Sequence, residues 1–114
     1  MSYGRVESRA RTGTTGINVE QDVTAGNGVF IIPPDRVAAV TIAVHLISNS
    51  ATFTIETSCN RPETIGENGT GGYWDNVYGV GATLSEDTVV MIANAVSGIR
   101  VNCLTGSVNV AFCG

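Results

Sequence analysis

The chain has 114 residues, a formal net charge of −4 and 43% hydrophobic residues. This length suits one domain and leaves no room for two independent cores. No apolar run approaches the ~18 residues that a membrane-spanning helix needs, because Thr41 and His45 interrupt the longest apolar stretch, 37–47. Composition therefore predicts one globular domain that does not span a membrane and that needs neither metal nor disulfide bonds to form a core.

Charge is unevenly distributed along the chain, which has six Arg and no Lys. Arg5, Arg9, Arg11 and one acid give residues 1–11 a net charge of +2, and the remaining three Arg and nine acids give −6. An acidic body argues against a nucleic-acid partner, since affinity for phosphate comes from clustered cations. A basic arm on an acidic body suits docking onto an acidic protein surface, and a solvated terminus is the competing interpretation.

Alternating apolar and polar residues predict two β-hairpins. In the first, strands over 40–47 and 52–59 flank a four-residue loop. In the second, strands over 99–104 and 107–112 flank a tight turn that contains Gly106. Each pairing gives one apolar and one more polar face, as in an antiparallel sheet buried on one side.

Weaker strand signals cover residues 17–23, 29–32, 77–80 and 88–92. Helix signals are poor, because β-branched residues are abundant and no segment has capping residues around a 3.6-residue apolar period. Six to eight short strands separated by turn residues predict an all-β fold, an antiparallel β-sandwich or jelly roll.

Two segments are expected to lack regular structure. Residues 1–16 are polar and read as a flexible or extended N-terminal arm, which leaves residues 17–114 as a single β-sandwich domain. Residues 60–72 form a long Gly-rich loop, and loops of this length in small domains are usually functional or mobile.

Residue groupings for catalysis or metal binding are missing from the sequence. His45 is the one histidine, no Cys pair has C-x-x-C spacing, and no nucleophile lies in a strand–turn–helix elbow. The hairpin register places His45 on the polar face beside Thr54. Asp75, Glu86 and Asp87 offer oxygen ligands for calcium but lack the spacing of a calcium loop. We therefore predict a protein that is not an enzyme and has no cofactor or metal.

The three cysteines and the Gly-rich loop carry little chemical signal. Cys59 and Cys103 are predicted to face the core as small apolar side chains, and a Cys59–Cys113 link stays open. The glycine-rich run 66–72 has no Lys and no following helix, so it does not fit a phosphate-binding loop.

Aromatic residues follow the loop closely. Tyr73, Trp74 and Tyr78 are candidates for an interface or for stacking on a sugar ring. For Trp74 we favour a structural role at one end of the sandwich core, and the roles of Tyr73 and Tyr78 stay open.

The layout from residue 37 to 112 resembles small β-sandwich proteins of tailed bacteriophages. The resemblance is carried by the segments VTIAVHLISNSATFTIETSC, GGYWDNVYGV, TVVMIA and SGIRVNCLTGSVNVAFCG. It implies a virion part such as a capsid decoration (cement) protein, made in the host cytoplasm, that forms a homo-oligomer with a trimer favoured. Its partner would be the major capsid protein or another virion protein, and the resemblance transfers no catalytic residue.

Two functions are therefore expected, with different surfaces. A decoration protein would bind its partner through the arm residues Arg5, Arg9 and Arg11. The alternative is a receptor- or carbohydrate-binding module of a tail or fibre, which would use Tyr73, Trp74 and Tyr78.

Overall fold

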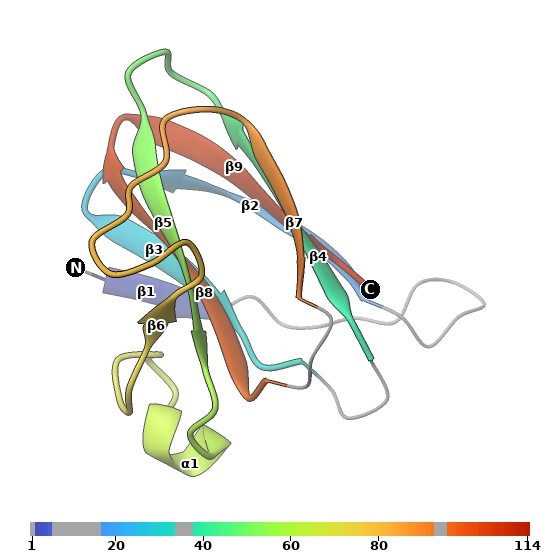
Figure 1. Cartoon of the computed structure of the whole chain (residues 1–114). Helices are drawn as coiled ribbons and strands as arrows, with labels where there is room; N and C mark the ends of the chain where they lie inside the picture. Colours follow the sequence, from blue (N-terminus) through green and yellow to red (C-terminus); the bar gives the residue numbers. More distant parts are fainter. Residues whose placement is uncertain (1, 6–16, 34–37, 93–95) are drawn as a thin grey trace.

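The computed structural model describes residues 2–5, 17–33, 38–92 and 96–114 (Figure 1). These residues form nine strands and one single-turn helix. In chain order the elements are β1 (Ser2–Arg5), β2 (Asn18–Thr24), β3 (Asn27–Ile31), β4 (Val40–Leu46), β5 (Thr52–Ser58), α1 (Pro62–Ile65), β6 (Asp75–Asn76), β7 (Thr88–Ile92), β8 (Gly98–Thr105) and β9 (Ser107–Cys113).

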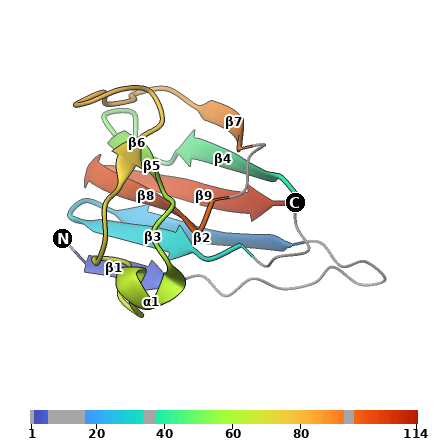
Figure 2. The same cartoon turned by 60° about the horizontal axis from the view of Figure 1, so that its bottom comes forward.

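The strands form two sheets that pack face to face (Figure 2). Sheet A has the order β1-β3-β8-β5-β6 and sheet B the order β2-β9-β4-β7. Described neighbours run antiparallel, except that β1 is parallel to β3. Counted from β2, sheet B holds the first, eighth, third and sixth strands, and sheet A the second, seventh, fourth and fifth. This order is that of a jelly roll, so the predicted all-β sandwich is confirmed.

Alternate residues of the strands meet between the sheets and form the core. Each strand with a period-two pattern buries one set of side chains and exposes the other, as in the pattern of β9. The largest side chains of this core are Phe53 and Phe112, one from each sheet, and both are fully buried. Aliphatic side chains surround them: Ile17, Val23, Val29, Ile31, Val40, Ile42, Val44, Ile55, Ile99, Val101, Val108 and Val110.

The two predicted hairpins are wrong, although most of their predicted inward-facing residues do face the core. β4 pairs with β7 and β9 in sheet B, whereas β5 pairs with β6 and β8 in sheet A. β8 and β9 are likewise divided between the sheets. A period of two shows which side chains point inward, but it does not distinguish a neighbour in the same sheet from a strand in the facing sheet.

Three connections that cross from one sheet to the other, β2–β3, β4–β5 and β8–β9, lie together at one end of the sandwich. Backbone hydrogen bonds join these crossings. Ala25 N–H donates to the carbonyl of Gly106 at 2.8 Å, and Ile47 N–H donates to that of Ser107 at 3.0 Å. Gly106 has a φ of +69° and faces the β4–β5 connection so closely that a Cβ there would lie 2.8 Å from Ala51 Cα. Only glycine fits this position without displacing backbone.

Smaller differences from the sequence prediction concern the loops. The 60–72 loop contains α1, whose first turn begins with Pro62 and ends before Gly66 at φ +77°. The strand predicted over 77–80 is wrong, because the short strand β6 lies before it and turns follow. Of the predicted arm, residues 2–5 form β1 beside β3, and 1 and 6–16 lie outside the described residues.

No helix in the described part of the chain has the length and hydropathy that crossing a membrane requires.

A matched pair of glycine substitutions tests the contact between the crossings. Gly26 has a φ of +82° but open space around its Cβ position, so Gly26→Ala should cost about 1–2 kcal/mol from backbone strain alone. Gly106→Ala adds a clash with the β4–β5 connection. The free energy of unfolding of this variant should fall by about 1–3 kcal/mol more than that of Gly26→Ala. Urea unfolding measures both values, and equal losses would contradict the close approach.

Candidate interaction surfaces

The outer face of sheet A is covered by the loop between β5 and β6. Gly69 lies directly on the ring of the fully buried Phe30, because a Cβ added at Gly69 would come within 2.5 Å of ring atom Cδ1. Ile65 of α1 is buried beside Gly98, where an added Cβ would meet its Cδ1 at 3.1 Å. The Gly-rich loop is therefore a packed cover, and its glycines permit close approach to the sheet.

Arg100 of β8 binds the loop between β5 and β6 to the outer face of sheet A. Its Nε donates to Glu56 Oε1 at 2.9 Å, and its Nη1 donates to the carbonyl of Gly69 at 2.9 Å. The guanidinium also lies 4.3 Å from the ring centroid of Trp74, a cation–π distance. The side chains of Arg100 and Glu56 are only 12% and 17% exposed, so this is a largely desolvated ion pair.

Neighbouring polar groups complete the cluster. Asn102 is buried, and its Nδ2 donates to Thr54 Oγ1 at 2.9 Å and also to Glu56 Oε1. These contacts join β5 to β8 on the outer face of sheet A. The polar cluster thus has a structural task, which is to hold two strands and the loop together.

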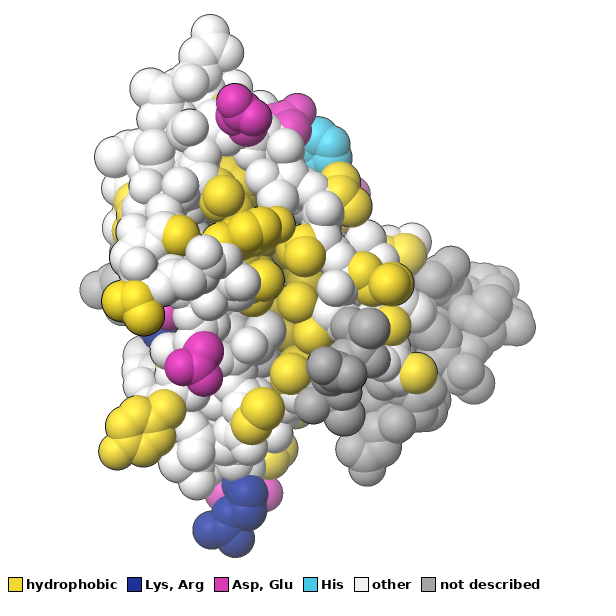
Figure 3. Space-filling view, in the orientation of Figure 1, with side chains coloured by type: hydrophobic (Ala, Val, Ile, Leu, Met, Phe, Trp, Pro, Cys, Tyr) yellow, Lys and Arg dark blue, Asp and Glu magenta, His cyan; other side chains and the backbone are white. Residues whose placement is uncertain are grey.

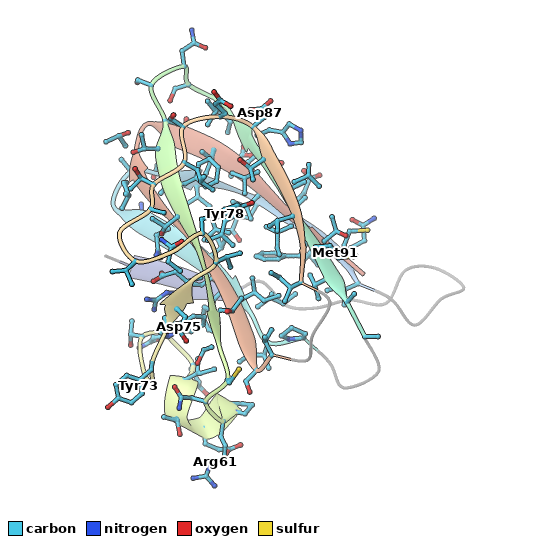
Figure 4. The ribbon with its side chains drawn as sticks, viewed as in Figure 1. Arg61, Tyr73, Asp75, Tyr78, Asp87 and Met91 are labelled. Atoms are coloured by element: carbon cyan, nitrogen blue, oxygen red, sulfur yellow. The ribbon has the colours of Figure 1, made fainter. Side chains whose placement is uncertain are left out.

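The aromatic candidates separate into one structural residue and two surface residues. Trp74 lies under Arg100 and beside Gly98, and its Nε1 donates to the carbonyl of Gly71 at 3.0 Å. It covers the outer face of sheet A and does not cap the core between the sheets, so that prediction was wrong in its location. Tyr73 is 83% exposed and Tyr78 is 45% exposed, and Figure 4 shows them well apart along the 73–78 segment. They do not form one stacking platform with Trp74.

The remaining sequence candidates are scattered. His45 is exposed, but it pairs with Asn109 of β9, and Thr54 lies in the other sheet. No group of three or more His, Cys, Asp or Glu side chains that could hold a metal occurs in the described ranges. Arg5 belongs to β1, while Arg9 and Arg11 lie outside the described residues.

The cysteine prediction is half right. Cys103 is buried in the core, and burial raises the pKa of its thiol, so this residue acts as a small apolar side chain. Cys59 is exposed, contrary to the prediction, because β5 ends one residue earlier at the buried Ser58. Cys59 is a free thiol and is not linked to Cys113.

The outer face of sheet B is bare of described residues and has small side chains at its centre. Ala43 of β4 pairs with Ala111 of β9 on one side and with Val89 of β7 on the other. Val89 and Met91 are 65% and 62% exposed at the β7 edge of this face. In the space-filling view, which shows the β7 edge of the sandwich, hydrophobic side chains gather in a band beside β7 (Figure 3).

The opposite margin of this face is acidic. Glu20 and Asp22 of β2 both accept from Asn109 Nδ2, at 3.2 and 2.8 Å. The face therefore passes from charged side chains on β2, through Ala43 and Ala111 with the polar pair His45 and Asn109 beside them, to apolar side chains on β7. Sequence reasoning missed it, because the hairpin interpretation placed β4 and β9 in the wrong pairs.

No known protein family, curated protein or solved structure matches this chain.

Removing the Arg100 guanidinium should loosen the loop cover and destabilise the fold. Arg100→Met leaves Glu56 largely buried without its cation, which should cost about 3 kcal/mol in the free energy of unfolding. Arg61→Met is the matched control, because its pair with Glu63 is 3.9 Å long and highly exposed, and should cost about 0.5 kcal/mol or less.

Urea unfolding gives both energies, and Trp74, the one tryptophan of the chain, reports on the loop by its fluorescence. We expect Arg100→Met to shift the native emission to longer wavelength and Arg61→Met to leave it unchanged. A stable Arg100→Met protein with unchanged emission would show that the cluster does not hold the cover.

Proposed function

We propose that this chain is a structural protein that works through protein–protein contacts, as a decoration protein of a bacteriophage head. The observation that carries this proposal is the outer face of sheet B, which no described residue covers and which has Ala43 and Ala111 at its centre and exposed Val89 and Met91 at one edge. Exposed apolar groups that gather on one face of a small domain mark interaction sites.

Among the described residues, the least exposed ion pair, Arg100 with Glu56, holds strands and loop together, so these charges serve the fold. The resemblance of residues 37–112 to phage β-sandwich proteins supports the choice of a virion as the assembly. The partner proposed is the major capsid protein or another virion protein.

A carbohydrate-binding module of a tail or fibre is the second candidate. The exposed Tyr73 favours it, since an aromatic ring at 83% exposure is available for stacking. The position of Trp74 under Arg100, where its ring is only partly exposed, weighs against a platform made of all three aromatic residues. A glycan array comparing the wild type with Tyr73→Ala separates the two functions, because the decoration role predicts no glycan signal from either protein.

A charge placed at the centre of the outer face of sheet B should block the binding of the protein to phage particles. Ala43→Arg should weaken the binding of the purified protein to phage heads at least about tenfold, because the new charge would have to be desolvated at the contact. Ala25→Arg, in the exposed β2–β3 turn, is the matched control and should bind like the wild type. Co-sedimentation with heads measures affinity, and mass spectrometry of purified particles measures copy number. Absence of the protein from particles would refute the proposal.

The arm should contribute a salt-dependent part of the affinity. Replacing Arg5, Arg9 and Arg11 together by Gln should weaken head binding and flatten its dependence on salt, since it removes cations that face an acidic partner. Arg61→Gln, which removes an exposed cation at the N-cap of α1, is the control and should change neither quantity. Identical salt dependence of the triple variant and the wild type would exclude a role for these residues.

A further inference from the structure

β7 is the edge of sheet B that lacks the usual protection against pairing with another strand. Among the described strands it pairs only with β4, so no described strand takes up the backbone N–H and C=O groups on its other side. Its five residues, TVVMI, include no charge, no Pro and no Gly. Figure 2 shows β7 at the margin of the molecule, beyond β4.

Two of the three other edges, β2 and β6, differ from β7 in a consistent way. β2, at the far side of sheet B, carries the exposed Glu20 and Asp22, and charges on an edge strand oppose pairing. β6, at one edge of sheet A, is only two residues long. Edges that natural proteins leave free are normally short or charged in this manner. The contrast within one molecule indicates that β7 has a partner.

We propose that the partner of β7 is the β7 strand of a second copy of this chain, paired antiparallel about a two-fold axis. Main-chain groups of an edge strand are satisfied by another extended strand. The result is a continuous eight-stranded sheet in the order β2-β9-β4-β7-β7-β4-β9-β2. This proposal deepens the structural function proposed above and rests on it for its biological role, but its test requires no particle.

Side-chain chemistry selects the antiparallel direction. A parallel pair would set Glu86 and Asp87, which directly precede β7, beside the same acids of the second copy. Like charges placed directly opposite each other destabilise a strand pair. An antiparallel pair moves these acids to opposite ends of the joined strands, so that the neutral residues of β7 meet in the middle.

The register follows from the two faces of the strand. With Val90 opposite Val90 of the second copy, all five residues pair, and Val89 lies opposite Met91 of the second copy. Thr88, Val90 and Ile92 then stay on the core side of both sheets, while the exposed Val89 and Met91 stay on the outer side. Val89 and Met91 would thus form two equivalent apolar cross-strand contacts, one on each side of the axis.

Two double variants of the exposed positions test both the contact and its register. V89K/M91K places Lys opposite Lys at both contacts, and should weaken self-association at least about tenfold. V89K/M91E places the introduced lysine of one copy opposite the introduced glutamate of the other at both contacts, and should keep self-association within a few-fold of the wild type. In a parallel pair the second variant would oppose like charges and would dissociate as well.

Sedimentation equilibrium of the full chain over a range of concentrations measures the monomer–dimer constant. Circular dichroism and thermal unfolding confirm that each variant is folded, which is expected because both side chains are exposed. We expect a dimer for the wild type and for V89K/M91E, and a monomer for V89K/M91K.

Several results would overturn the pairing: a wild type that stays monomeric at its highest soluble concentration, a trimer that V89K/M91K leaves intact, or open-ended fibres, which a closed two-fold contact does not produce. Head binding by a monomeric wild type would reject the β7 contact and leave the structural function standing. A β7 dimer that is absent from particles would do the reverse.

Discussion

The structure depends on the packing of two sets of inward-facing side chains across the gap between the sheets. Phe53 and Ile55 from sheet A meet Val110 and Phe112 from sheet B in one buried cluster. Apolar burial is the dominant favourable term in folding, so every long strand must place its alternate residues in this gap. Because successive strands mostly alternate between the sheets, the chain builds both halves of the core together.

This constraint makes the corners of the fold as important as its strands. Each crossing must turn the chain from one layer to the other within a few residues, and the tightest does so around Gly106. Backbone hydrogen bonds from Ala25 and Ile47 tie the neighbouring crossings to it. The order of the sheets and the packing of the corners are therefore one feature of the molecule.

The outer faces of the two sheets differ in whether a loop covers them. On sheet A, Arg100 and Trp74 hold a loop that covers the strands, so this face is closed. On sheet B the described residues leave Val89 and Met91 exposed and Ala43 partly exposed. Among the described residues, one outer face is therefore covered and the other is not, and β7 lies at the margin of the uncovered face.

The sequence predicted the elements better than their partners. Alternation located β2, β4, β5, β8 and β9 and identified Cys103 as a core residue, because side-chain direction in a strand is a local property. Pairing is not local: β4 and β5 have the pattern of a hairpin but belong to facing sheets. For the same reason the sequence did not reveal the Arg100–Glu56 pair, whose residues are 44 positions apart and meet only because β5 pairs with β8.

Surface features were harder still to foresee. The run TVVMI, without a charge or a proline, was visible as a strand, but only the sheet order shows that it lies at an edge.

The central claim, that β8 and β9 lie in facing sheets and do not form a hairpin, is tested most directly by nuclear Overhauser effects between backbone protons. Ala111 of β9 should show cross-strand contacts to Ala43 of β4 and Glu20 of β2, which are its register partners. A hairpin between β8 and β9 would instead connect Ala111 with Arg100. Contacts of Ala111 to Ala43 and Glu20 are the predicted result, and contacts to Arg100 in their place would contradict the jelly-roll order.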